Sequence, residues 1–272
     1  MSCGRLDELQ EALGSQISLT DPDARSMTST GRYTGTVGYN LQAAIDAEHH
    51  RIVAHEVTNI GHDRTQLAPM ALKAKAALGT DHLTALADRG YYNAQQILAC
   101  EQADRQTGII PLVLKPLTSN SKAEGRFDKR DFVYEPTLDT YLCPAGEHAT
   151  PRFTTEENGL TLHKYWSSAC PDCSMRDQCT TARYRRISRW EHEHVLDSMQ
   201  IRLDARPQVA VARRQTVEHV FCTLKAWLGT TPLLTKTLPK VRTEISLAVL
   251  AYNMKRMIKI VGMPRMLRAI AA

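Results

Sequence analysis

Hydrophobic residues follow two different periods along the chain. Alternation at every second position over about 38–46 and 51–57 predicts two β-strands joined by a polar turn around Glu48–His50. Continuous apolar runs at 82–87 and 108–116 are typical of buried strands. Helical spacing predicts four helices, at 64–78, 93–103, 207–227 and 242–261. Strands and helices in this order indicate an α/β fold in which helices flank a sheet.

The pattern breaks between about 117 and 206, where turns, Pro, Gly, charged residues and four cysteines are concentrated. We therefore expect an inserted subdomain with little apolar core of its own. Residues 186–199, RISRWEHEHVLDSM, predict a helix that links the insertion to the main core. The expected organisation has four parts: 1–36 as N-terminal segment and linker, 37–116 as the first part of the core, 117–206 as the insertion, and 207–272 as C-terminal helices.

The segment 213–229 places charged residues at the edge of an apolar stripe. With about 100° of rotation per residue, Arg214, Glu218 and Lys225 fall within one narrow stripe of a helix. A solvent-exposed charged face would lie opposite the apolar stripe, but the charged stripe of this helix borders the apolar stripe. The apolar stripe has four members: Val217, Phe221, Leu224 and Leu228. A surface Arg–Glu pair is the simpler interpretation, and a carboxylate directed at a site beside the core is the alternative.

Composition and charge narrow the class of protein. A chain with 43% hydrophobic and 23% charged residues is globular. It has no apolar run of transmembrane length, no secretory signal and an odd number of cysteines, seven, so we expect a cytoplasmic protein without a disulfide framework. The net charge is +5, yet residues 201–272 hold thirteen Lys and Arg against three acids. Such a basic segment favours a nucleic-acid partner.

Three carboxylates stand where chemistry is expected in such a fold. Asp46 and Asp88 each follow a predicted strand, and Glu218 lies on a later helix. Three carboxylates brought together suit Mg²⁺ or Mn²⁺, and two such ions can stabilise both oxygens of an in-line phosphoryl displacement. Arg214 and Lys225 would then hold phosphates beside Glu218. For each aspartate alone, a turn residue is the simpler interpretation.

Three sequence blocks, GYNLQAAIDAEH, ALADRGYYN and ARRQTVEHVFCTLKAWLG, resemble the signature blocks of bacterial DDE transposases. The similarity runs from about residue 21 to 265 and is greatest to the insertion-sequence group called IS1182, within the IS4/IS5-type enzymes. In the third block, Arg214, Glu218 and Lys225 fit the family spacing, whereas Val211 stands where the family has Tyr. The chain therefore lacks the Tyr of the family pattern and keeps the position of Glu218.

The resemblance implies an RNase H-like mixed sheet with Asp46 on the first strand, Asp88 after the fourth, and Glu218 on the helix that follows an insertion. It implies an enzyme that binds two Mg²⁺ or Mn²⁺ ions, hydrolyses a DNA phosphodiester at a transposon end and joins the 3′-hydroxyl to target DNA. A homodimer is expected in the active complex. Relatives carry a helical DNA-binding region ahead of this domain, and only about twenty residues precede Asp21 here, so we expect that region to be missing.

Two other functions remain open from the sequence. An RNase H-like nuclease would cut DNA without joining it. A truncated, inactive transposase would act only as a DNA-binding regulator. For the transposase, Arg214 and Lys225 are expected to contact phosphates next to the cut site, and Lys115 and the Lys255–Arg256 pair to extend these contacts.

The cysteines of the insertion are spaced like metal ligands. Cys170 and Cys173 form a C-x₂-C pair, and Cys143 and Cys179 flank it at longer spacings. Four thiolates suit a tetrahedral structural zinc site, which a small subdomain with little core would need. His148 and His163 are rival ligands, and reduced thiols in an irregular loop are the alternative. Of the other three cysteines, Cys100 and Cys222 are expected to pack helices, whereas Cys3 has no assigned role.

Overall fold

The computed structural model describes residues 18–27, 36–115, 120–227 and 232–271. The chain forms two compact units, one made of Met1–Leu114 with Met199–Ala272 and the other of Lys115–Ser198. The second unit begins close to the start of the insertion expected from the sequence and ends earlier than expected. The sequence also predicts a short amphipathic helix within residues 1–20, but residues 1–17, which include Cys3, lie outside the described residues.

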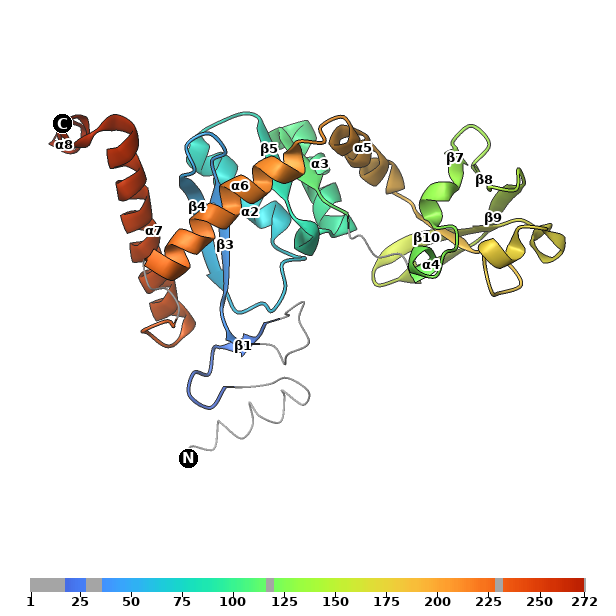
Figure 1. The fold of residues 1–272 in the computed structure, drawn as a ribbon, viewed down its shortest axis with the longest axis horizontal. Helices are drawn as coiled ribbons and strands as arrows, with labels where there is room; N and C mark the ends of the chain where they lie inside the picture. The colour runs from blue at the N-terminus through green and yellow to red at the C-terminus, as the bar shows by residue number, and fades with distance from the viewer. Residues whose placement is uncertain (1–17, 28–35, 116–119, 228–231, 272) are drawn as a thin grey trace. The chain divides into compact units, whose positions relative to one another are not determined.

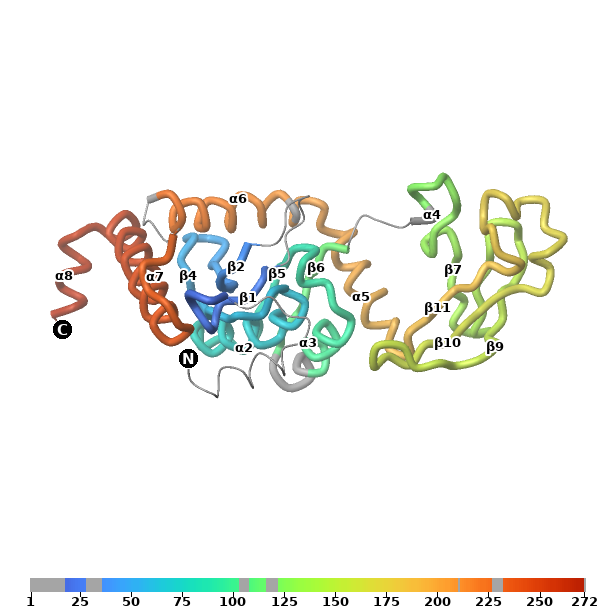
Figure 2. The backbone as a smooth tube through the Cα atoms, turned by 90° about the horizontal axis from the view of Figure 1, so that it is seen from below, coloured from blue at the N-terminus to red at the C-terminus, as the bar shows by residue number. Residues whose placement is uncertain are grey.

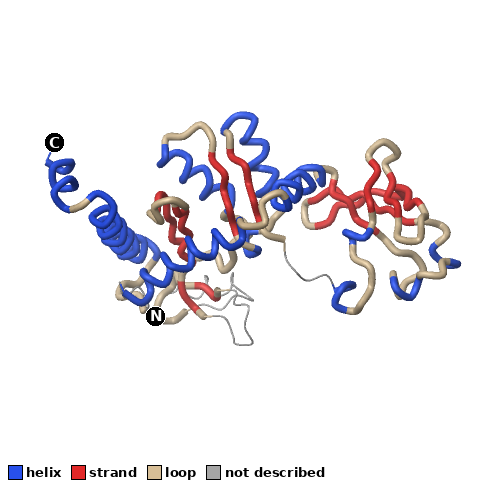
Figure 3. The backbone as a smooth tube through the Cα atoms, turned by 45° about the horizontal axis from the view of Figure 1, so that its top comes forward, coloured by secondary structure: helices blue, strands red, loops and turns tan. Residues whose placement is uncertain are grey.

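The strands of the first unit form separate pairs instead of one continuous sheet (Figure 3). An antiparallel hairpin joins β3 (Asn40–Ile45) to β4 (Ile52–Thr58), and β5 (Leu83–Ala87) runs parallel to β6 (Ile109–Val113). Two short strands, β1 (Arg25–Ser26) and β2 (Val37–Gly38), make a third pair. Within the described residues no strand ladder connects the hairpin to the parallel pair, so the single mixed sheet expected from the sequence is not formed there.

Helices cover both sides of these strands. Figure 2 shows α6 on one side and α2 and α3 on the other. Helix α5 belongs to both units, since the boundary between them falls within it. The helices that include residues of this unit are α2 (Leu67–Leu78), α3 (Ala94–Thr107), α5 (Glu193–Asp204), α6 (Val209–Cys222), α7 (Leu238–Val261) and α8 (Met263–Ala271), with a 3₁₀ turn at Arg89–Tyr91 and a π-helical turn at Thr223–Trp227.

One face of the β3–β4 hairpin packs against α6 and α7 (Figure 1). The buried members of this core are Ile52, Val57, Val220, Leu224, Val241, Ile245, Val249 and Tyr252. Polar side chains of α7 also bind the backbone of β4. Asn253 bonds both the N–H of Ile52 at 3.0 Å and its C=O at 2.8 Å, and Arg242 donates to the C=O of Val57 at 3.0 Å. Since backbone groups at a strand edge need partners, these bonds fix α7 on the hairpin.

The N-terminus of α7 is capped by side chains from the start of the chain. Thr237 has a positive φ of 72° and makes no side-chain cap of its own. Asp23 accepts the N–H of Leu238 at 2.8 Å, and Asp21 accepts the N–H of Thr237 at 3.2 Å. Tyr39 donates its hydroxyl to both oxygens of Asp21 at 2.8 Å. Carboxylates at this position satisfy free N–H groups and interact favourably with the helix dipole.

The second unit contains an antiparallel sheet of five strands in the order β11-β10-β9-β8-β7. Its core consists of the buried residues Phe132, Tyr141, Ala149, Tyr165 and Ile187. The strands are β7 (Val133–Glu135), β8 (Thr140–Leu142), β9 (His148–Glu157), β10 (Leu160–Trp166) and β11 (Ile187–Trp190). Short helical turns complete the unit at Asn120–Ala123 (α4), Lys129–Asp131, Cys170–Asp172 and Arg176–Gln178.

Two expectations about this unit are corrected by the structure. The insertion has an aromatic core of its own. The linking helix expected over 186–199 begins only at Glu193, as α5, because Ile187–Trp190 forms strand β11. The signal for the sheet was present in Asn158–Gly159, which joins β9 to β10 with φ values of 52° and 73°. An Asn-Gly pair between alternating residues favours a two-residue hairpin, because both residues tolerate positive φ.

The buried face of α6 also differs from the expected stripe. The fully or nearly buried residues of this segment are Thr216, Val220 and Leu224, whereas Val217 and Phe221 are half-buried. On a helix with about 100° per residue, this face is rotated by about 70° from the predicted apolar stripe. Glu218 therefore lies about 160° from Val220, on the exposed side, and not at the border of the core. Lys225 lies in the π-helical turn Thr223–Trp227, where the rotation per residue differs from that of an α-helix. Lys225 is therefore displaced from the stripe that contains Arg214.

Candidate active site

Asp46 lies directly after β3, as predicted, and is held by the turn that follows. Its carboxylate accepts the N–H of Glu48 at 3.0 Å and pairs with Arg51 at 3.4 Å. Burial alone would raise the pKa of the Asp46 carboxyl, but the Glu48 N–H and the Arg51 guanidinium outweigh it and lower the pKa. Asp46 is therefore charged and already has a cationic partner.

Asp88 lies directly after β5, also as predicted. Its Oδ1 accepts the N–H of Gly90 at 3.0 Å, which begins the 3₁₀ turn, and its Oδ2 pairs with Arg213 of α6 at 2.6 Å. The side chain of Asp88 is 35% exposed, so a ligand can reach it. Arg213, one residue before the predicted phosphate ligand Arg214, was not expected to have a role.

Helix α6 lies next to both aspartates. Arg213 reaches Asp88, and the ring of His219 lies 6.2 Å from that of His50, in the turn that Asp46 begins. Arg213 and His219 are six residues apart, or about 9 Å along the helix axis. Burial lowers the pKa of His50, and the nearby Arg256 and His219 add to this effect, while Asp46 opposes it. One helix thus spans the two strand ends that carry Asp46 and Asp88.

Glu218 does not join them in this arrangement. It lies between Arg213 and His219 in sequence, but it is exposed on the opposite side of the helix from the buried face. Across the described part of the chain, no three His, Cys, Asp or Glu side chains are arranged to hold a metal ion. The surface Arg214–Glu218 ion pair, the simpler interpretation of this stripe, is not formed among these residues either.

A carboxylate that the sequence did not indicate lies beside Asp88. Asp63 accepts amide N–H groups from Asn40 at 2.8 Å and from Gln42 at 2.7 Å. Gln42 is only 1% exposed, and its amide oxygen accepts the hydroxyl of Tyr91. Burial raises the pKa of the Tyr91 hydroxyl, and the charges of Asp63 and Asp88 raise it further. The signal in the sequence was the polar pair Asn40 and Gln42 on one face of an otherwise apolar strand.

Gly90 separates the two carboxylates. A Cβ atom built at Gly90 would lie 3.1 Å from Oδ1 of Asp88 and 3.3 Å from Oδ2 of Asp63. Both oxygens therefore approach the same point on the 3₁₀ turn, and a side chain there would crowd them. Asp63, Asp88 and Arg213 therefore form a cluster of charged side chains beside α6.

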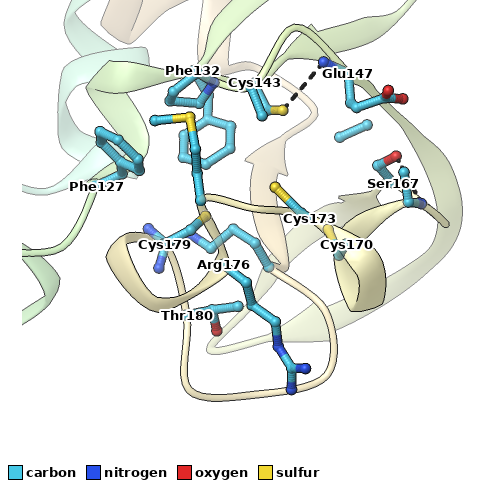
Figure 4. Close-up of a pocket in the computed structure, with 16 residues that line it drawn as sticks. Phe127, Phe132, Cys143, Glu147, Ser167, Cys170, Cys173, Arg176, Cys179 and Thr180 are labelled. Carbon is cyan, nitrogen blue, oxygen red and sulfur yellow. Dashed lines mark hydrogen bonds between the residues drawn. The ribbon is translucent and has the colours of Figure 1, made fainter.

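The four cysteines of the insertion line one cavity of about 30 Å³ (Figure 4). All four are half-buried free thiols. The rival ligands lie elsewhere: His148 is 3.1 Å from the hydroxyl of Thr140, and His163 is 2.9 Å from that of Thr154. Of the expected packing cysteines, Cys100 is buried on α3, but Cys222 is exposed on α6, so the expectation was wrong for Cys222.

The predicted DNA-contacting residues lie in different surroundings. Arg214, Lys225 and Lys255 are exposed. Arg256 instead donates two hydrogen bonds to the C=O of His49, at 2.6 and 3.1 Å, and so holds the turn after Asp46. Lys115 is the first residue of the second unit.

Residues 142–258 match the family model described as the transposase DDE domain. The match runs from β8 into α7, covers less than half of the chain, and includes Glu218 and the four cysteines but neither aspartate. Neither curated proteins nor solved structures gave a match. The match supports a DDE transposase, an enzyme class that acts on DNA and generally uses divalent metal ions. No helix of the described residues has the length and apolarity to span a membrane.

Proposed function

We propose that this chain is the catalytic part of a cut-and-paste DDE transposase of the IS1182-like group, with an RNase H-like core. It cleaves a DNA phosphodiester at a transposon end and joins the 3′-hydroxyl to target DNA. The observation that carries the proposal is the position of α6, which lies beside the strand-end residues Asp46 and Asp88 and within the segment that matches the transposase DDE domain.

The donor set fits the metals that this chemistry uses. Asp46, Asp88 and Glu218 would supply carboxylate oxygens, which Mg²⁺ and Mn²⁺ prefer. When bound, two such ions would activate the attacking oxygen and neutralise the leaving oxygen. Arg51 and Arg213 form ion pairs with the two aspartates in this structure. Both guanidiniums would have to leave the aspartates when metal ions bind, and would then be available to bind phosphate oxygens.

The proposal includes a rotation of α6, because Glu218 lies on the exposed side of the helix. A turn of about 70° would exchange Thr216 and Val220 for Val217 and Phe221 in the core, and would leave Leu224 at its edge. Val217 and Phe221 are apolar, so the rotated helix also buries an apolar face. The π-helical turn at Thr223–Trp227 is a place where such a change can be absorbed, since π turns often occur at functional sites.

A second candidate function is a DNA-binding regulator without catalysis. The exposed position of Glu218, on the opposite face from the helix core, favours it. An RNase H-like nuclease without strand transfer is a third outcome. The assay that separates them incubates the purified chain with a labelled transposon-end duplex and a target plasmid in Mg²⁺, in Mn²⁺ and in EDTA. Cleavage with joined products supports the transposase, cleavage without joining supports the nuclease, and binding without cleavage supports the regulator.

Asp63 is proposed to assist Asp88. Two carboxylates near one glycine repel each other, so a cation beside them is favoured. We expect Asp63→Asn to lower Mg²⁺-dependent cleavage by roughly 10–100-fold, the range typical of residues that support metal ligands. The exposed Asp81→Asn is the control, and its rate should equal that of the wild type. Equal cleavage rates for both variants would limit Asp63 to a structural role.

DNA binding is proposed to involve Arg214 of α6 and Lys225 of the π-helical turn that follows it, with Lys255 of α7 extending the contact. Lys115 is proposed as a separate phosphate contact of the second unit. We expect Lys225→Ala to weaken binding to an end-like duplex and to reduce the slope of log K against log[salt] by about 0.9, the value for one phosphate contact. Lys255→Ala should have a smaller effect, because Lys255 lies on α7. Unchanged affinity and slope in Lys225→Ala would show that Lys225 is only a surface charge.

Light scattering of the DNA complex tests the expected homodimer.

A further inference from the structure

We propose that Cys143, Cys170, Cys173 and Cys179 bind one structural Zn²⁺ ion in the second unit. All four side chains line the same cavity, although they come from two segments of the chain (Figure 4). The cavity of about 30 Å³ is large enough for an ion but not for an organic ligand. Four cysteine thiolates are the usual ligand set of a structural zinc site, and here all four line one cavity.

The local backbone presents these thiols as metal-binding turns do. Cys143 begins a tight turn in which Gly146 donates to its C=O at 2.9 Å and Glu147 donates its N–H to the sulfur at 3.3 Å. Gly146 has φ of 83°, which only glycine adopts readily. An N–H directed at sulfur stabilises a thiolate. Cys170 begins a 3₁₀ turn that ends at Cys173, so the C-x₂-C pair projects from one turn.

The charges that line the cavity also suit a zinc–thiolate complex. Zn²⁺ would displace the protons of the four thiols when it binds. Four thiolates and one Zn²⁺ carry a net charge of −2, and Arg176 and Arg185, which line the cavity, are placed to offset it.

The site also has a structural purpose. Cys143 and Cys179 pack against the aromatic core of this unit. The loop that carries Cys170, Cys173 and Cys179 has no strand between β10 and β11 to hold it. Zinc would fasten this loop to the β8–β9 turn at Cys143. As arranged here the described thiols do not yet surround a single point at ligand distance, so binding would draw them inward.

Metal analysis of the full chain, purified from zinc-supplemented cells without metal-affinity resin, tests this proposal independently of DNA cleavage. We expect about one Zn²⁺ per chain in the wild type, and near-complete loss in Cys170→Ser and Cys173→Ser. Cys222→Ser is the matched control, since this exposed cysteine lies on α6 in the first unit, and it should keep its zinc.

A second variant covers the case in which serine variants fail to fold. Cys179→His keeps a zinc ligand, because imidazole also binds zinc, and should retain the metal where Cys179→Ser loses it. Cobalt added to the apoprotein should give the visible absorption of a tetrahedral thiolate complex. Wild-type protein without zinc whose thiols all react with a thiol reagent, or a Cys170–Cys173 disulfide, would overturn the proposal.

Discussion

Asp88→Ala is expected to reduce Mg²⁺-dependent DNA cleavage by roughly 10²–10³-fold or more, the range seen when one electrostatic group is removed from an active site. The reason is that Asp88 stands at a strand end, is 35% exposed and shares its surroundings with Asp63 and Arg213. Asp46→Ala should have a similar effect on cleavage. The measurement is the single-turnover rate on a labelled end duplex, with Asp81→Ala as the control.

The fold of these variants has to be checked alongside the rates. Asp46→Ala also removes the bond to Glu48 and the ion pair with Arg51, so a modest loss of stability is expected. A far-ultraviolet spectrum and a urea unfolding curve separate this loss from the loss of chemistry. Wild-type cleavage by Asp88→Ala, with the fold intact, would remove Asp88 from the active site.

Val220→Ala and Phe221→Ala should separate the two proposed positions of α6. Val220 is fully buried and Phe221 is half-buried. We expect Val220→Ala to lower the free energy of unfolding by about 1–3 kcal/mol. Phe221→Ala should lower it less but reduce cleavage more, because Phe221 enters the core only in the rotated helix.

The two measurements are urea unfolding without metal or DNA, and cleavage in Mg²⁺. Leu224→Ala is the internal reference, since Leu224 is buried now and stays at the edge of the core after the rotation, so it should lower both stability and cleavage. If Phe221→Ala cleaves DNA as fast as the wild type, the proposed rotation of α6 is wrong.

The sequence predicted strands β3 to β6 and helices α2, α3, α6 and α7 well, because each is amphipathic or apolar over its whole length. It did not predict the short β1–β2 pair or helix α8. The turns after β3 and β5 were predicted with Asp46 and Asp88 in place, since the apolar runs end there. The face of α6 that is buried in the structure could not be predicted. Both Val220 and Phe221 are apolar, and the choice between them depends on the π-helical turn and on packing against α7, which no local pattern encodes.

Other features depend on contacts between distant residues. Asp63 is held by Asn40 and Gln42, twenty-three and twenty-one residues away, so nothing local marks it as part of the site. The aromatic core of the second unit was missed because charged and polar residues alternate with its members. Tyr134 and Tyr165, for example, both donate to Asp139 and so bury their rings around a carboxylate.

The central claim is that Glu218 completes a metal site with Asp46 and Asp88, and Glu218→Gln tests it most directly. Glu218 is exposed, so the substitution should leave the free energy of unfolding unchanged. The single-turnover rate of cleavage of a labelled transposon-end duplex in Mg²⁺ is the measurement. We predict a loss of roughly 10²-fold or more, with unchanged DNA binding. Cleavage at the wild-type rate by Glu218→Gln would contradict the account.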